Sequence, residues 1–447
     1  MKNGFTLMEL LAVIVILAVI VTIAAPIVLD VITDSKASAR LRSVEYYLKA
    51  VEQEILENEI DNTGTFNPGT CIIQKDGSLL CDGKDVVKID TSGTPPTSGV
   101  LVFEDQKIKD VLLNVGDQVI KRDKDNKLIL ASTVLSDYIK NLYKPTTTTT
   151  LNNIVYSLDE KHELMNDRLG DASASAADGN IRYYGPNPNN YIDIGDRDSD
   201  GNIIFWRIIG LFHDVEVTDE FGEVIKTEDL VKIIRADSLS AGDTNSFSWD
   251  YTSTGEYDNK WSNSTLQIML NDGYYNSSTT QYYNNNTTPT MLDFYSEGLS
   301  PETYNLIEKV QWNTDGHTTF QIYADEMYNF ERQGNNVWPA KVGLVYMSDY
   351  VYAFDLTKCQ NNIYNSVTTS VCKNANWMYD SSNFQWTLTP ITKNTINVYD
   401  IPNTFFTTGH NSLNNTYAIR PVLYLKFNAV VAEEKKTETG MKYLVIK

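Results

Sequence analysis

Basic residues are scarce in this chain. Its 447 residues include 37 Lys and Arg against 58 Asp and Glu, which gives a formal net charge of -21. A surface with this excess of negative charge repels phosphate backbones. We therefore expect no general nucleic-acid binding, and we expect most of the chain to face water.

Histidines and recognisable catalytic motifs are also few. The four histidines lie far apart in the sequence and include no H-E-x-x-H pair. The chain contains no G-x-S-x-G motif, P-loop or dinucleotide-binding fingerprint. Its four cysteines lack the close C-x-x-C spacing that is typical of a zinc site. We expect a protein that is not an enzyme and that holds no resident cofactor.

One feature that is present is a long apolar run near the N-terminus. Residues 10–29 carry no charge, and an apolar helix of about 20 residues spans roughly 30 Å of hydrocarbon. The run is too long for a secretory signal peptide, whose apolar core has about 7 to 15 residues. Glu9 directly precedes it, and an ionisable group at the membrane edge indicates a functional site.

The stretch KNGFTLMELLAVIVILAVI resembles the class III signal of type IV pilins and type II secretion pseudopilins. The resemblance implies that a prepilin peptidase removes the leader, residues 1–4, after Gly4 and methylates Phe5. It further implies that Glu9 is an assembly group, paired with the terminal amine of an adjacent subunit, and that Pro26 loosens the helix. The implied partners are the peptidase, other pilin subunits, the assembly platform and the membrane.

This resemblance also implies a location. The chain would cross the cell membrane once, at about residues 10–29, with its N-terminus in the cytoplasm. Its bulk would be extracellular, on the cell surface or in a pilus.

An amphipathic helix is predicted to continue from the membrane segment to about residue 60. Apolar residues recur at helical spacings of three and four on one face: Ala37, Leu41, Val44, Leu48, Val51 and Ile55. Short strand-like runs over residues 61–143 then predict a small antiparallel β head on which this helix packs. A long helix on a β head is the pilin-like arrangement that the resemblance implies.

The cysteines fall into two local pairs. The run CIIQKDGSLLC predicts a hairpin in which Gly77 adopts a positive φ and Cys71 lies opposite Cys81. Cys359 and Cys372 form the second pair. Four cysteines allow three connectivities, and we expect the local one, because paired cysteines are usual in an exported chain.

A second body is predicted after a change of composition. KPTTTTT at residues 144–150 predicts a linker over 144–179 that includes a helix and a loop. Residues 180–447 are predicted to form a larger, strand-rich α+β domain, so the fold class of the whole chain is α+β. All seven tryptophans lie in this body. They suit either a core or a contact face for carbohydrate or protein, and we expect most of them to be buried.

Several runs in this body, among them YYGPNPNNYI, WRIIG, VGLVYMSDYVYA and RPVLYLK, resemble an uncharacterised domain of Gram-positive surface proteins. The resemblance covers most of residues 180–447. It implies an extracytoplasmic domain with no known catalytic residue, which leaves an unknown extracellular ligand as its partner. Within the same body, SPETYNLIEKV predicts a short helix with Ser300 as N-cap and Pro301 at its first position.

An acidic run in the second body is compatible with two interpretations. The residues Asp196, Asp198, Asp200 and Asn202 are spaced like the start of a calcium-binding loop. The twelfth position of such a loop, which requires a glutamate, is occupied by Arg207. We therefore expect an acidic hairpin turn and retain calcium binding as the alternative.

Two functional interpretations remain. In the first, the chain is a minor or tip pilin subunit, because a large distal body would crowd every repeat of a filament, and this body serves adhesion or ligand binding. In the second, the chain is a pseudopilin-like or membrane-anchored surface protein whose distal domain binds or senses a ligand without extensive polymerisation. Adhesion, DNA uptake, motility and secretion are not distinguished by these residues.

Overall fold

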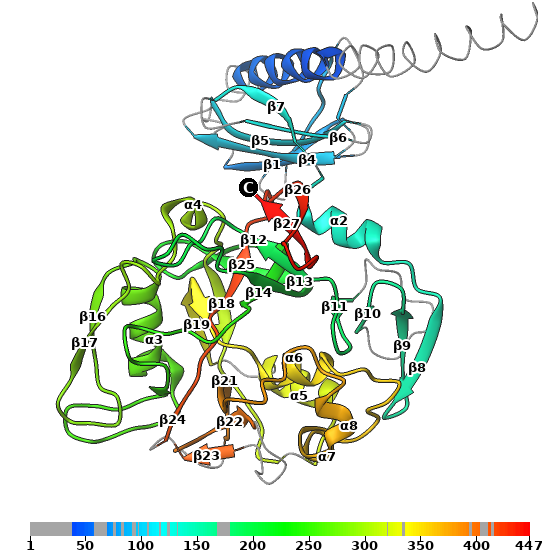
Figure 1. Ribbon diagram of the computed structural model, residues 1–447. Helices are drawn as coiled ribbons and strands as arrows, with labels where there is room; N and C mark the ends of the chain where they lie inside the picture. Colours follow the sequence, from blue (N-terminus) through cyan, green and yellow to red (C-terminus); the bar gives the residue numbers. More distant parts are fainter. Residues whose placement is uncertain are drawn as a thin grey trace, which may run out of the picture. The chain divides into compact units, whose positions relative to one another are not determined.

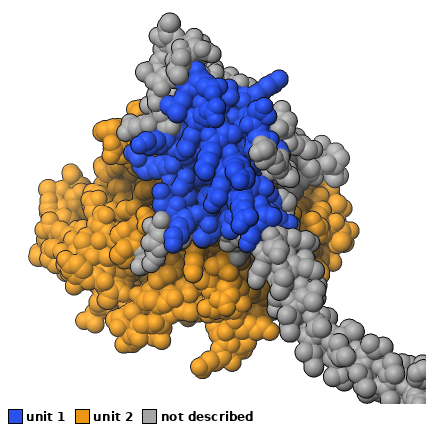
Figure 2. Space-filling view, turned by 90° about the horizontal axis from the view of Figure 1, so that it is seen from above, with its two compact units in different colours: residues 1–132 blue, residues 133–447 orange. Residues whose placement is uncertain are grey.

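The computed structural model of the chain describes residues 38–57, 69–74, 77–81, 85–91, 95–96, 98–104, 107–115, 118–122, 126–131, 133–167, 179–319, 321–332, 336–392, 396–402, 410–412 and 415–447. The chain divides into two compact units, unit 1 (Met1–Ser132) and unit 2 (Thr133–Lys447), which are coloured separately in Figure 2. Within the ranges above, no helix is long and apolar enough to cross a bilayer. The predicted leader and membrane segment lie outside these ranges.

Unit 1 combines one helix with one antiparallel sheet. The helix occupies residues 38–57. The sheet has seven strands in the order β3-β2-β1-β4-β5-β6-β7. Their bounds are β1 Thr70–Ile73, β2 Leu79–Cys81, β3 Asp85–Val87, β4 Ser98–Glu104, β5 Lys107–Val115, β6 Gln118–Arg122 and β7 Leu128–Ala131. Unit 1 thus contains a single antiparallel sheet, in which β1 pairs with both β2 and β4.

The helix of unit 1 lies against this sheet (Figure 1), and its apolar face packs on the strands. Val44, Leu48, Val51 and Ile55 are buried in one cluster with residues of the strands, which confirms the predicted stripe over the described part of the helix. Tyr47 joins the same face, and its hydroxyl donates a hydrogen bond to the carbonyl oxygen of Gly77 at 2.9 Å. The remaining residues of the predicted helix, 5–37 and 58–60, lie outside the described ranges.

The β1–β2 hairpin has the predicted register. Cys71 lies opposite Cys81 across the two strands, and the two cysteines form a disulfide. Gly77 in the connecting turn has a φ of +83°. A residue with a Cβ adopts this conformation only at a cost, so glycine suits the turn.

Unit 2 is built around a mixed sheet of thirteen strands. Its centre is a long hairpin of β13 (Trp206–Thr218) and β14 (Val224–Arg235). The other strands are β8 Thr147–Leu151, β9 Ile154–Asp159, β10 Leu164–Asn166, β11 Ile181–Tyr183, β12 Tyr191–Asp193, β18 Val310–Asn313, β19 Val337–Ala340, β20 Val342–Gly343, β25 Val422–Leu425, β26 Val431–Lys436 and β27 Lys442–Ile446. One pair, β12 with β27, is parallel.

Helices and three small sheets complete unit 2. The helices are α2 Leu135–Leu142, η1 Trp261–Asn263, α3 Thr265–Ile268, η2 Met269–Tyr274, α4 Pro301–Tyr304, α5 Ala324–Arg332, α6 Met347–Tyr352, α7 Ile363–Thr368 and α8 Ser370–Lys373. The small sheets pair β15 (Phe247–Ser248) with β24 (Thr416–Tyr417), β16 (Thr279–Tyr282) with β17 (Thr290–Asp293), and β22 (Asn397–Ile401) with both β21 (Gln385–Pro390) and β23 (His410–Ser412). Ser300 caps α4 as predicted, by accepting a hydrogen bond from the backbone N–H of Thr303.

The segment expected to be a linker differs from the prediction. Residues 147–151 form β8, which pairs with β9 in the main sheet of unit 2, and the helix expected after them is absent from the described residues 151–167. Threonine is β-branched and favours strands. Asn152 and Asn153 connect the strands with φ values of +50° and +64°, as a two-residue hairpin turn requires. Unit 2 therefore begins before residue 144, and it includes α2.

The tryptophans of unit 2 are mostly core residues, as expected. Six of the seven are at most 4% exposed: Trp206, Trp249, Trp261, Trp312, Trp377 and Trp386. Trp338 is partly buried and packs against the same core. The tryptophans therefore do not form an exposed contact face.

Candidate functional site

A cavity of about 160 Å³ opens on one face of the central sheet of unit 2. It is lined by side chains from β13, β14, β18 and β25, from α5, and from the start of α6. Helices α5 and α6 lie side by side (Figure 1), and both contribute to the lining. Lys232 of β14 and Tyr424 of β25 lie directly opposite each other in the sheet, so their side chains project from the same face into the cavity.

Two residues that line the cavity, Lys232 and Asp349, belong to a chain of four buried charges. The ammonium of Lys232 donates to Oδ2 of Asp349, and Nη1 of Arg182 donates to Oδ1 of the same carboxylate at 2.7 Å. Arg182 donates from Nε to Asp167. All four residues are at most 5% exposed. Since an unpaired buried charge costs several kcal/mol, the alternation of cation and anion is what allows these groups to lie in the interior of unit 2.

Burial and ion pairing have opposite effects on the pKa values of these charged groups. Burial lowers the pKa of Lys232 to about 8, although the Asp349 carboxylate opposes this effect. Burial alone would raise the pKa of Asp349, but the neighbouring Lys232 and Arg182 outweigh it and hold that pKa below its ordinary value. The Asp349 carboxylate is therefore the fixed negative centre that two cations share.

Aromatic rings surround the lysine. Its Nζ lies 4.3 Å from the ring centre of Tyr346 and 5.0 Å from that of Phe212. The rings of Tyr424 and Trp312 follow at 5.5 and 5.7 Å. At these distances the ring faces attract a cation, so the aromatic walls stabilise the ammonium in a site with little water.

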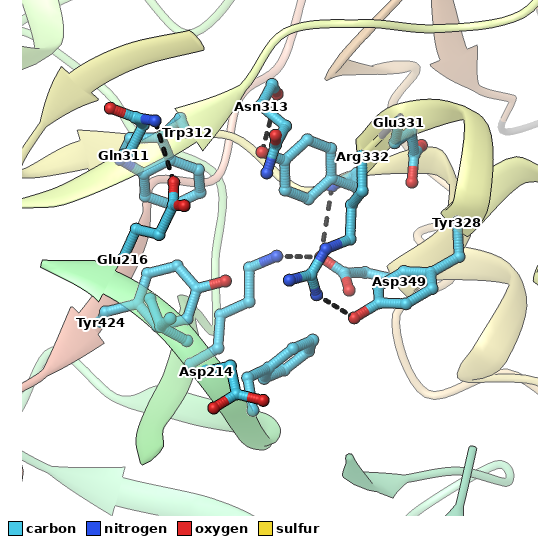
Figure 3. Close-up of a pocket in the computed structure, with 14 residues that line it drawn as sticks. Asp214, Glu216, Gln311, Trp312, Asn313, Tyr328, Glu331, Arg332, Asp349 and Tyr424 are labelled. Atoms are coloured by element: carbon cyan, nitrogen blue, oxygen red, sulfur yellow. Dashed lines mark hydrogen bonds and ion pairs between the residues drawn. The ribbon is translucent and has the colours of Figure 1, made fainter. Parts of the chain in front are cut away.

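Helix α5 supplies the second side of the cavity. Tyr328, Glu331 and Arg332 are three and four residues apart, which places them on one helix face. The guanidinium of Arg332 donates to the Tyr328 hydroxyl and lies 5.0 Å from the centre of that ring. Among the described residues it has no carboxylate partner. Figure 3 shows Arg332, Tyr328 and Asp349 on one side of the cavity and Glu216, Gln311 and Trp312 on the other.

Glu331 is a buried carboxyl group with one free oxygen. Its Oε1 accepts hydrogen bonds from the Thr389 hydroxyl and from the backbone N–H of Ser348 at 3.2 Å. Its Oε2 has no hydrogen-bond partner in the part of the chain that the structure describes. Burial raises the pKa of Glu331 to about 7. Buried polar atoms are normally paired, so this oxygen is an exception within unit 2.

A β-bulge in β13 shapes the third side of the cavity. The register of β13 against β14 shifts between Phe212 and Val215, and Asp214 inside the shift has a φ of +52°. Aspartate tolerates this left-handed conformation better than most residues. Its exposed carboxylate lines the cavity and has no ion-pair partner among the described residues. Bulges occur often beside functional sites, where they redirect a side chain.

The residues predicted for processing and assembly lie outside the described ranges. These are Gly4, Phe5, Glu9 and Pro26. The predicted disulfides are both present, Cys71 with Cys81 and Cys359 with Cys372.

The acidic run is a hairpin turn, closed by a bridge between Arg197 and Ile203. Asp198 accepts hydrogen bonds from the backbone N–H groups of Asp200 and Asn202 at 2.9 and 2.8 Å. Asp196 is buried instead, and its carboxylate accepts from the Trp206 indole at 3.0 Å. Among the described residues no three potential metal ligands converge. The run is thus the expected acidic hairpin turn, in which Asp196 and Asp198 accept hydrogen bonds from neighbouring groups, and calcium binding stays the alternative prediction.

The charged residues of the cavity were not predicted from the sequence. Lys232 stands inside the apolar strand DLVKIIR, Arg182 inside NIRYYG, and Asp349 inside VYMSDYVYAF. A charged residue within a strand that is otherwise apolar on both faces is an available signal, because it must find a buried partner. The sequence does not show which partners meet.

Comparison with known protein families gives a match at the N-terminus. Residues 1–25 match the family described as the prokaryotic N-terminal methylation motif. This is a prepilin-type signal, which implies processing by a prepilin peptidase and a membrane or pilus-like surface location. No curated protein and no solved structure matches the chain. Unit 2 and its cavity are therefore interpreted from their own chemistry.

Proposed function

We propose that the chain is a type IV pilin-like subunit, minor or at the tip of a filament. In this proposal a prepilin peptidase cleaves it after Gly4 and methylates Phe5. The N-terminal helix assembles with other pilin subunits on the assembly platform, and unit 2 is displayed on the cell surface for adhesion or ligand binding.

The observation that carries the proposal is the methylation motif at residues 1–25. Unit 1 supports it, because the helix at residues 38–57 packs one apolar face on an antiparallel sheet. A pilin uses such a helix to connect the membrane segment to its head. Unit 1 is therefore compatible with the pilin-like subunit that the methylation motif implies.

The size of unit 2 favours a minor or tip subunit over a major one. Unit 2 contains Thr133–Lys447, more than two thirds of the chain. A major subunit repeats along the whole filament, where a body of this size would crowd its neighbours. A tip or occasional subunit avoids this crowding and presents unit 2 to the surroundings.

Glu9 provides the test of assembly. After cleavage, the amine of Phe5 would be a cation at the same membrane depth as the Glu9 carboxylate, and burying either charge alone in a filament would be costly. We expect Glu9→Ala to leave insertion and cleavage intact but to reduce sharply the fraction recovered in sheared filaments. Glu9→Asp should be intermediate. Glu45→Ala, which removes an exposed carboxylate from the described part of the helix, is the matched control.

The alternative is a pseudopilin-like or membrane-anchored protein that does not polymerise extensively. The same experiment distinguishes the two proposals. Equal recovery of Glu9→Ala and the unaltered chain in the filament fraction would favour the anchored protein, as would the absence of any filament fraction.

A further inference from the structure

We propose that the cavity of unit 2 binds a small zwitterion, a molecule of about the size of one amino acid that carries both a carboxylate and an ammonium group. This inference rests on the ligand-binding part of the proposed function and names the class of ligand. It does not depend on cleavage or filament assembly.

The volume of the cavity limits the ligand to a few heavy atoms. The cavity holds about 160 Å³, and a cavity of about 150 Å³ accommodates one benzene molecule. A single amino acid of small or medium size fits this space. A peptide or an oligosaccharide exceeds it.

Two cations line the cavity, Lys232 and Arg332. The buried Lys232 is paired with Asp349, whereas Arg332 is exposed. Arg332 lines the cavity without a carboxylate partner among the described residues. Because a planar guanidinium binds a carboxylate through two parallel hydrogen bonds, we place the ligand carboxylate against Arg332, with Lys232 as the second cation.

Strand β13 contributes two carboxylates to the cavity lining. Asp214 is exposed and unpaired among the described residues. Glu216 is exposed as well, and its Oε2 accepts one hydrogen bond, at 2.9 Å from the amide of Gln311. These two carboxylates would repel a simple anion, but they would attract the ammonium group of a zwitterion.

A purely cationic ligand fits the cavity less well than a zwitterion. The aromatic faces that would attract it are already engaged by the protein's own cations, since Lys232 lies over Tyr346 and Arg332 over Tyr328. An apolar ligand would leave these charged groups without partners. The guanidinium of Arg332 on α5 and the carboxylates of Asp214 and Glu216 on β13 together match the two charges of a zwitterion.

Binding is measured on the full chain, purified in detergent micelles, by isothermal titration calorimetry. The probes are the common free α-amino acids, and each amino acid that binds is then compared with its N-acetyl and its amide derivative. The first derivative lacks the ammonium group and the second lacks the carboxylate. We expect each derivative to bind at least about tenfold more weakly, since a hydrogen bond between charged groups contributes on that order.

Variants at two positions, Arg332 and Asp214, test where the charged groups of the ligand bind. Arg332→Gln should weaken binding of the amino acid by about tenfold or more, whereas Arg332→Lys, which retains the charge but not the planar fork, should weaken it less. Asp214→Asn should also weaken binding, because it removes a carboxylate that attracts the ammonium group of the ligand. Asparagine tolerates the positive φ at this position. Asp243→Asn removes an exposed carboxylate elsewhere in unit 2, and it should leave the affinity unchanged.

The proposal is overturned if no free amino acid binds, if both derivatives bind as well as the free amino acid, or if a neutral monosaccharide binds in its place. The derivatives test the idea even if an Arg332 variant fails to fold. Because the titration needs neither processing nor assembly, its failure leaves the pilin proposal standing. Likewise, normal filament recovery of Glu9→Ala leaves the ligand proposal standing.

Discussion

Replacing Glu331 by glutamine should make unit 2 more stable at neutral and alkaline pH. The carboxyl group is 1% exposed, and its only hydrogen bonds among the described residues are those that Oε1 accepts from Ser348 and Thr389. The amide oxygen of glutamine can accept both of these bonds. The substitution therefore removes the charge and retains the shape and the donors that face it.

The size of the effect follows from the pKa. Burial raises the pKa of Glu331 to about 7, from an ordinary value of 4.5. The folded protein binds this proton more tightly than the unfolded chain does. The protonated carboxyl group therefore makes its full contribution to the free energy of unfolding below pH 4.5, and this contribution is lost as the pH rises to about 7. A pKa shift of this size corresponds to about 3 kcal/mol of unfolding free energy.

The unaltered chain should thus lose about 3 kcal/mol of unfolding free energy from this group between pH 4.5 and pH 8, and Glu331→Gln should not. The two proteins should be similarly stable at pH 4.5, and the variant should be more stable at pH 8. Denaturant unfolding followed by tryptophan fluorescence measures this in unit 2, because all seven tryptophans lie there.

Glu220→Gln is the matched control, because Glu220 is exposed and such substitutions change stability by less than about 0.5 kcal/mol. A stability difference between Glu331→Gln and the unaltered chain that does not vary with pH would refute the reasoning. So would a variant that is less stable at pH 8.

Three further predictions concern other parts of the chain. N-terminal sequencing and mass spectrometry of the mature protein should find methylated Phe5 as the first residue, and an intact Met1 would contradict processing after Gly4. Gly343→Ala should destabilise unit 2 by about 1 to 3 kcal/mol, because a Cβ at this position would lie 2.8 Å from the ring of Trp312; denaturant unfolding measures the loss, and an unchanged midpoint would show that the ring moves freely. Breaking the disulfide that closes the 10-residue separation between Cys71 and Cys81, by replacing both with serine, should cost unit 1 about 2 to 3 kcal/mol. Hydrogen exchange of the sheet amides measures this cost, and unchanged protection would contradict it.

The features of unit 1 that could be predicted from the sequence depend on residues close together in the chain. The apolar stripe from Val44 to Ile55 predicted the buried face of the helix, because a helix repeats every 3.6 residues. The hairpin between Cys71 and Cys81 followed from alternating strands and from Gly77 in the turn. The processing signal is likewise one continuous stretch, so its motif was recognisable without a fold.

Some local signals were present but were interpreted wrongly. The threonines of residues 147–150 suggested a linker by composition, yet they form β8. The decisive signal was the Asn152–Asn153 pair, whose positive φ values allow a tight hairpin. A β-branched strand next to such a turn finds its partner immediately along the chain, and β9 is that partner.

The charged residues at the cavity are brought together only by the tertiary structure. Arg182 and Asp349 are 167 residues apart, and Lys232 and Asp349 are 117 apart. Each of these residues, taken singly in the sequence, is a charge inside an apolar run. Only the packing of β11, β14 and α6 brings them together, because a buried charge is tolerated where an opposite charge from elsewhere in the chain meets it, and no periodicity of the sequence encodes that meeting.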